Sequence, residues 1–93
     1  MNRADLIRQL ADKFHPLTAK DIELSVRAIL DEMLRHLANG GRIEIRGFGS
    51  FGLNYRPPRK GRNPKSGATV MVLGKYAPHF RAGKELRERV DIN

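Results

Sequence analysis

The stretch from Arg56 to Gly67 holds most of the side chains whose types and spacing could do chemistry. It reads Arg-Pro-Pro-Arg-Lys-Gly-Arg-Asn-Pro-Lys-Ser-Gly, with five cations and no acid. Guanidinium and ammonium groups donate charge-assisted hydrogen bonds to phosphate oxygens, so this run could bind a polyanion. Its three prolines and two glycines leave little potential for a helix. A solvated loop that is positive only for solubility is the alternative, and the stretch by itself does not decide between the two.

The other reactive side chains of the sequence do not have the spacing of an enzyme site. There is no cysteine, which excludes a disulfide, a cysteine-based zinc site and a thiol nucleophile. Ser50 and the three histidines lie far apart in the sequence, and no phosphate-binding loop occurs. We therefore predict that the protein is not an enzyme and uses no cofactor, metal or small-molecule substrate.

The positive charge of the chain is concentrated in one block. The formal net charge is +8, yet residues 45–84 hold nine cations and no acid, while the remainder holds nine cations and all ten acids. A polyanion is the natural partner of such a block. Nucleic acid is favoured over an anionic membrane because the block has the pattern of strands and turns, not of an amphipathic helix.

Two helices are predicted ahead of this block. Asn2 is an expected N-cap for a first helix that ends at His15-Pro16. Thr18, with Asp21 three residues later, predicts a capping box for a longer helix that stops at Asn39-Gly40-Gly41. The apolar stripe of this second helix is wider than one short neighbouring helix needs, which indicates burial against a second subunit. The stripe comprises Ile22, Val26, Ile29, Leu30, Met33, Leu34 and Leu37.

The basic stretch lies between two predicted strands. Arg42–Arg46 alternates between polar and apolar residues and predicts a first strand; Phe48–Tyr55 and Thr69–Lys75 predict the strands of a hairpin. The hairpin tip is expected near residues 62–65. At about 3.3 Å per residue, an arm from Tyr55 to the tip could reach roughly 30 Å.

The last part of the chain is predicted to leave the sheet and end in a helix. Lys75–Phe80 is expected to leave the sheet, and residues 83–90 are expected to form a short closing helix. Phe48 and Phe51 are expected to be core aromatics, with stacking on bases as the alternative.

A chain of 93 residues suits one domain, but a small one. If about twenty residues project as an arm, about 70 remain for a core; a core of that size is marginal, and dimerisation is a common remedy. No apolar run approaches the ~20 residues of a membrane span, and the N-terminus lacks the apolar segment of a signal peptide. We expect a soluble cytoplasmic protein.

Three motifs of this sequence resemble the HU and integration host factor family of bacterial DNA-bending proteins. They are Gly47-Phe48-Gly49-Ser50-Phe51, then Gly61-Arg62-Asn63-Pro64 with Lys65 and Gly67, then Pro78-His79-Phe80 followed by Gly83-Lys84-Glu85-Leu86-Arg87. The match covers essentially the whole chain, and the three motifs together are highly specific. Within the family, Arg42-Ile43-Glu44-Ile45-Arg46-Gly47 is similar to the beta subunit of integration host factor.

The resemblance implies an α+β fold in an intertwined dimer. A helical body of two N-terminal helices carries a three-stranded antiparallel sheet that extends into a long β-hairpin arm, and a short C-terminal helix follows. One DNA-binding domain would span residues 1–93, with the helical body and first strand in 1–47, the strands and arm in 48–76, and the C-terminal helix in 77–93. Two such arms would wrap double-stranded DNA in its minor groove. The residues alone do not determine the groove, and a two-stranded ribbon fits the undistorted major groove more easily.

The resemblance also gives the arm residues their expected roles. Pro64 would insert between stacked base pairs and kink the duplex, whereas its spacing alone indicates only a turn proline. Arg62, Asn63 and Lys65 flank it. Arg62 could enter a narrow groove and bond to base-edge acceptors, and Asn63 could donate or accept there. Further cations would line the arm against phosphates, or form a solvated face: Arg56, Arg59, Lys60 and Lys75.

Six more residues outside the arm are expected to contact DNA. Glu44 could fix the geometry of Arg42 and Arg46 on a sequence-reading surface, or the three could form a neutral ladder on a wet face. Helix N-termini bind phosphate readily, so Arg3 on the first helix and Lys84 on the third could clamp flanking DNA. Lys20, at the start of the second helix, could help.

The expected function is that of an architectural, nucleoid-associated subunit that bends DNA in recombination, replication, and transcription and translation regulation. Its partner would be a related alpha-type subunit or a second copy of the same chain. A less selective HU-like homodimer that compacts the chromosome is the first alternative. An RNA-binding or ribosomal protein, which would bind structured RNA without bending duplex DNA, is the second.

Overall fold

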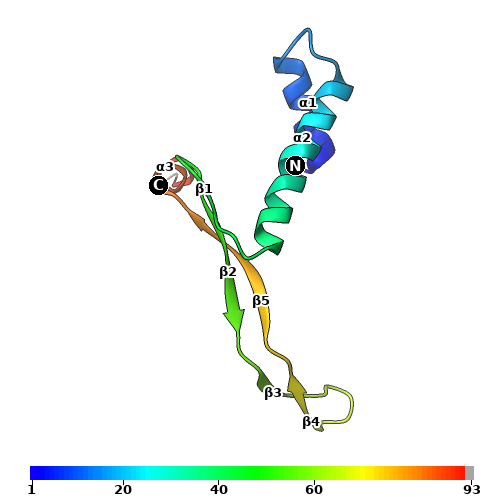
Figure 1. Ribbon diagram of the computed structural model, residues 1–93, viewed down its shortest axis with the longest axis vertical. Coiled ribbons are helices and arrows are strands. Elements are labelled where there is room, and N and C mark those ends of the chain that lie inside the picture. Colours follow the sequence, from blue (N-terminus) through cyan, green and yellow to red (C-terminus); the bar gives the residue numbers. More distant parts are fainter. Residues whose placement is uncertain (92–93) are drawn as a thin grey trace. The chain divides into compact units, whose positions relative to one another are not determined.

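A computed structural model describes residues 1–91 of the chain, and Figure 1 shows its helices and strands. The chain forms two compact units, Met1–Arg35 and a second that begins at His36. Helices precede an antiparallel sheet and a short helix follows it, so the predicted α+β class is confirmed. The elements are α1 (Arg3–Lys13), α2 (Ala19–Ala38), β1 (Ile43–Ile45), β2 (Gly49–Arg56), β3 (Arg59–Arg62), β4 (Thr69–Val72), β5 (Lys75–Ala82) and α3 (Lys84–Val90).

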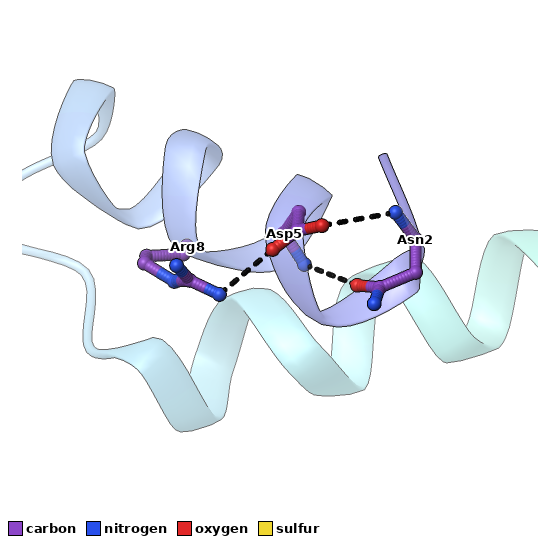
Figure 2. A network of polar contacts seen from close by, with 3 residues as sticks. All are labelled: Asn2, Asp5 and Arg8. Carbon is purple, nitrogen blue, oxygen red and sulfur yellow. Dashed lines mark hydrogen bonds and ion pairs between the residues drawn. The ribbon is translucent and has the colours of Figure 1, made fainter.

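Helix α1 begins where the sequence predicts, at a reciprocal capping box. The side-chain oxygen of Asn2 accepts the backbone N–H of Asp5 at 2.9 Å, and the Asp5 carboxylate accepts the backbone N–H of Asn2 at 3.1 Å. The other Asp5 oxygen accepts a guanidinium N–H of Arg8 at 2.8 Å, as Figure 2 shows. Because the cap satisfies helix donors that would otherwise need water, it fixes the start of the helix.

Helix α2 has a second capping box and a glycine stop. Thr18 Oγ1 accepts the Asp21 N–H at 3.1 Å, and the Asp21 carboxylate accepts the Thr18 N–H at 3.3 Å. At the other end, Gly40 has a φ of +86°, and the N–H groups of Gly40 and Gly41 donate to the carbonyls of Leu37 and His36. These bonds satisfy the last carbonyls of the helix, and the positive φ favours glycine.

The apolar stripe of α2 is buried only at its N-terminal end. Ile22 and Val26 are each 7% exposed, and they are the only buried apolar side chains among residues 1–91. Further along the same stripe, Ile29 is 60% exposed and Leu34 is 69% exposed. A single chain therefore leaves much of this stripe open to water. None of the helices within the described residues is long and apolar enough to cross a membrane.

The second unit contains a three-stranded antiparallel sheet in the order β1-β2-β5 and a separate β3-β4 hairpin. The prediction that Lys75–Phe80 leaves the sheet is wrong. Strand β5 runs antiparallel to the whole of β2, from Gly49 opposite Ala82 to Arg56 opposite Lys75. A proline is tolerated on an edge strand, where its missing N–H can face away from the ladder, so Pro78 does not break β5.

The aromatic side chains form clusters but not a buried core. Phe80 lies between Phe51, with ring centroids 4.7 Å apart, and Phe48, at 5.4 Å. Phe48 is nevertheless 44% exposed and Phe51 is half-buried. The prediction that both are core aromatics is therefore wrong for the single chain, in which neither ring is fully buried.

Candidate nucleic-acid interface

The three-stranded sheet has one apolar face and one polar face. Directly opposed residues of an antiparallel pair share a face, and successive pairs alternate between faces. One face therefore carries Phe51 with Phe80, Leu53 with Pro78, and Tyr55 with Tyr76. The other face carries Glu44 with Ser50, Ser50 with Arg81, Gly52 with His79, Asn54 with Ala77, and Arg56 with Lys75.

Two of the predicted DNA-binding cations meet on this polar face. Arg56 and Lys75 lie directly opposite each other at the end of the β2–β5 ladder, and both are exposed. Like charges in directly opposed positions destabilise a sheet unless an anion lies between them. Neither side chain has an ion pair with any acid in the described part of the chain. The pair is thus placed and charged to hold a phosphate group.

The polar face continues into an open groove of about 550 Å³. The groove brings together the predicted residues Arg42, Glu44 and Arg46 with two residues that the sequence analysis did not single out, Ser50 and Arg81. Arg81 was counted only as part of the basic block. Its position on the polar face depends on the β2–β5 pairing. The alternation of residues 75–82 is the sequence signal that could have identified it. That signal was not used because these residues were expected to leave the sheet.

Glu44 does not hold either arginine in an ion pair. Among residues 1–91, no contact within ion-pair distance joins its carboxylate to a lysine or arginine. Glu44 is the middle residue of β1, and Arg42 and Arg46 flank that strand in the sequence. The role expected for Glu44 with the two arginines has no direct ion pair behind it in the single chain and stays a prediction.

The β3–β4 hairpin forms the arm, but the predicted pairing of residues 48–55 with residues 69–75 is wrong. Strand β2 pairs with β5, and β4 pairs with β3, which lies inside the stretch that was expected to be rich in turns. Arg59 pairs with Val72, Lys60 with Met71, and Arg62 with Thr69. Lys60 and Arg62 consequently share one face of the hairpin, and Arg59 lies on the other. All three cations are exposed and form no ion pair within residues 1–91, so their charges are available to a partner.

A packed junction joins the arm to the sheet. The rings of Tyr55 and Tyr76 lie 5.0 Å apart at the end of the sheet, just before the ladder is interrupted. The backbone at Gly74 passes so close that a Cβ there would collide with the Tyr55 hydroxyl and stand 3.0 Å from Cδ of Pro58. The absence of a side chain at Gly74 therefore allows this close packing at the base of the arm.

The tip of the arm is a turn organised by Asn63. Its side-chain oxygen accepts the backbone N–H of Lys65 at 2.8 Å and that of Ser66 at 3.4 Å. The backbone N–H of Asn63 donates to the carbonyl of Ala68 at 2.8 Å. Because its side-chain oxygen accepts these two bonds, the group that Asn63 has left to offer a base edge in this turn is its amide N–H₂. Pro64 lies in this turn and is exposed.

The three predicted cations at the starts of helices are all exposed, but they differ in how close an acidic side chain lies. Arg3 and Lys20 lie in the first unit at the starts of α1 and α2. The capping acid Asp5 shares the first turn with Arg3, and its negative charge opposes a phosphate there. Lys84 begins α3 and is 4.0 Å from a carboxylate oxygen of Glu88, with 82% of its side chain exposed. Residues 1–91 contain no cluster of three side chains that could hold a metal ion.

Comparisons with known proteins agree with this arrangement. The family model described as bacterial DNA-binding protein matches residues 1–91. Integration host factor subunit beta of Laribacter hongkongensis (strain HLHK9) is 65% identical over 93 residues, which is all of this chain and 94% of that protein. The same subunit of Azoarcus sp. (strain BH72) is 66% identical over 92 residues, or 99% of this chain and 98% of that protein.

The fold is also similar to solved structures. A cocrystal structure of Anabaena HU with DNA superposes with a TM-score of 0.91 at 32% identity and covers 100% of both chains. HU from Thermotoga maritima superposes with a TM-score of 0.67 at 30% identity, over 98% of this chain and 100% of that one. With its whole described length matched, the chain belongs to the HU and integration host factor family of bacterial DNA-binding proteins.

Proposed function

We propose that this protein is an architectural DNA-bending subunit of the integration host factor beta type. The observation that carries the proposal is the hairpin arm, which presents cations without acid partners and ends in a turn with an exposed Pro64. Integration host factor and HU are themselves established examples of proteins that enter the minor groove and insert apolar wedges there. Both units of the chain would act together as one DNA-binding domain.

Pro64 is suited to the role of the wedge. Its ring is rigid and apolar, and it has no N–H that would lose water on insertion between bases. The hydrogen bonds of Asn63 hold the turn that presents it. Unstacking one base step costs a few kcal/mol, which the additional contacts of a bent duplex offset. Lys60, Arg62 and Lys65 would supply those contacts around the wedge.

The partner in this function is a second subunit as well as DNA. Ile29 and Leu34 of α2 are largely exposed, as is the apolar face of the sheet at Tyr55 and Tyr76. Covering these surfaces would remove apolar area from water, which is the main favourable term in association. We propose a related alpha-type chain as the partner, because the relatives with 65% and 66% identity are named subunit beta.

A protein of this kind would act in the nucleoid of the cytoplasm, in recombination, replication and gene regulation. An HU-like homodimer that compacts DNA with little selectivity is the second candidate, supported by the TM-score of 0.91 with an HU chain. The two differ in the ratio of affinities for a preferred site and for random DNA, compared at one salt concentration. Selectivity would come mainly from how easily a site deforms.

Ring closure of a short DNA fragment tests the bending function. A fragment below about 150 bp resists closure, because that is the persistence length of DNA. The protein, alone and with an alpha-type subunit, should increase the yield of ligated circles. A Lys60→Gln/Arg62→Gln variant should lose this effect, and a Lys13→Gln variant should keep it. Binding without any gain in circles would contradict the proposal.

A further inference from the structure

The arm carries apolar side chains that no part of the second unit covers. Met71 is 62% exposed and Leu73 is 78% exposed, although strand β4 and its neighbours lie in the most basic part of the chain. Strands in water normally place polar residues on an uncovered face. A hairpin that needed only positive charge would gain nothing from these two residues.

The register shows what surrounds them. Met71 lies directly opposite Lys60, and Arg62 lies opposite Thr69 on the same face. Leu73, two residues beyond Met71, lies just past the end of the β3–β4 pairing. One face of the paired strands thus combines Lys60 and Arg62 with Met71, and the still more exposed Leu73 follows directly at the end of the pairing.

A binding partner that is complementary to this face presents anions on either side of an apolar surface. The minor groove of DNA has this chemistry, because phosphates flank a groove whose walls are the C–H edges of deoxyribose. In an RNA helix the corresponding surface displays 2′-hydroxyl groups. A hydroxyl pressed against a methionine or leucine side chain loses its water and gains no hydrogen-bond partner, which is unfavourable.

We propose that Met71 and Leu73 contact deoxyribose in the minor groove and make the arm select DNA over RNA. The inference rests on the proposed function, and it assigns to these two residues the discrimination of the sugar. Lys60 and Arg62 would bind the flanking phosphates and contribute equally to both nucleic acids, because RNA and DNA share the same phosphate charge.

The test distinguishes the effect of the 2′-hydroxyl group on binding from the effect of helix shape. Hydroxyl-radical protection of an all-DNA complex maps the sugars beneath the arm. Duplexes of one sequence are then made with 2′-hydrogen, 2′-fluoro or 2′-hydroxyl groups at those positions. Fluoro and hydroxyl sugars both favour the RNA-like pucker, but only the hydroxyl has a donor to leave unsatisfied. The ratio of their dissociation constants therefore reports the contact with the hydroxyl.

For the unaltered protein we expect 2′-hydroxyl duplexes to bind about tenfold more weakly than 2′-fluoro duplexes, in the range for an unsatisfied polar group. In the Met71→Gln/Leu73→Gln variant the ratio should fall to about twofold or less, because glutamine can pair with the hydroxyl. Val70→Gln, on the opposite face of β4, should keep the unaltered ratio. Circular dichroism of each variant checks that its fold is retained.

Two outcomes would overturn the inference. The unaltered protein could bind both modified duplexes equally, or the double variant could keep the unaltered ratio. If the double variant keeps that ratio and also loses binding to phosphatidylglycerol vesicles, the apolar side chains are assigned to a lipid surface instead. If the unaltered protein gave no protection of all-DNA sugars, the proposed function would fail as well, and that result is distinct from the other two.

Discussion

Individual residues of the polar face and the arm have environments that suit a polyanion. Arg56 and Lys75 oppose each other, and among residues 1–91 neither they nor the arm cations Arg59, Lys60 and Arg62 form an ion pair. Glu44 is the exception, because it places a negative charge in the groove that also contains Arg46 and Arg81. A carboxylate there weakens the attraction for every phosphate and can accept a hydrogen bond only from a donor such as the exocyclic amine of cytosine.

Glu44→Gln should therefore raise affinity for random DNA and lower the preference for a specific site. We expect a gain of a few-fold on random duplex, since one like-charge repulsion is removed, with a larger loss in the ratio of specific to random affinity. Titrations of both duplexes at one salt concentration measure the two constants. Ser25→Ala in α2, outside the groove, is the matched control. An unchanged ratio would show that Glu44 does not take part in site selection.

At the scale of elements, the parts set by local signals could be predicted from the sequence and the parts set by pairing could not. Asn2 and Thr18 cap the two helices as expected, and Gly40 and Gly41 end the second, because caps depend on residues within one turn. The sequence did not predict the course of β5, because its place depends on pairing with β2, from Arg56 opposite Lys75 to Gly49 opposite Ala82. For the same reason the sequence did not identify Arg81 as a residue of the groove.

The capping box of α2 should have a measurable share in stability. Replacing Thr18 by alanine removes the acceptor for the Asp21 N–H, and the loss should be about 1 kcal/mol in the free energy of unfolding. Thr18→Ser retains the hydroxyl and should cost less. Urea unfolding followed by circular dichroism gives both values. Equal values for the two variants would mean that the hydroxyl is not what stabilises the start of the helix.

At the scale of the whole molecule, the chain has too little interior to be stable alone. Ile22 and Val26 are the only buried apolar side chains among its described residues, whereas Ile29, Leu34 and Tyr76 are mostly exposed. The sequence predicted burial of α2 against a second subunit, because its apolar stripe is wider than one short neighbouring helix needs. The exposed ring of Phe48 could not be predicted, because aromatic residues are usually buried and only the three-dimensional arrangement shows that its cover is missing.

Stability should consequently depend on protein concentration. Folding coupled to association raises the unfolding midpoint as subunits become more concentrated. Leu34→Glu, on the exposed stripe, should lower the midpoint and weaken association in sedimentation equilibrium. Arg27→Glu, on the polar face of α2, is the control and should change association much less. A midpoint that stays constant over a hundredfold range of concentration would contradict this account.

The bend of a duplex labelled at both ends, measured by fluorescence transfer with the Pro64→Ala variant, tests the central claim most directly. Pro57→Ala is the control, because Pro57 lies at the base of the arm. We predict that Pro64→Ala reduces the bend while its association rate stays near that of the unaltered protein, since the cations that attract DNA remain. A bend as large as that of the unaltered protein would contradict the role of Pro64 as the wedge.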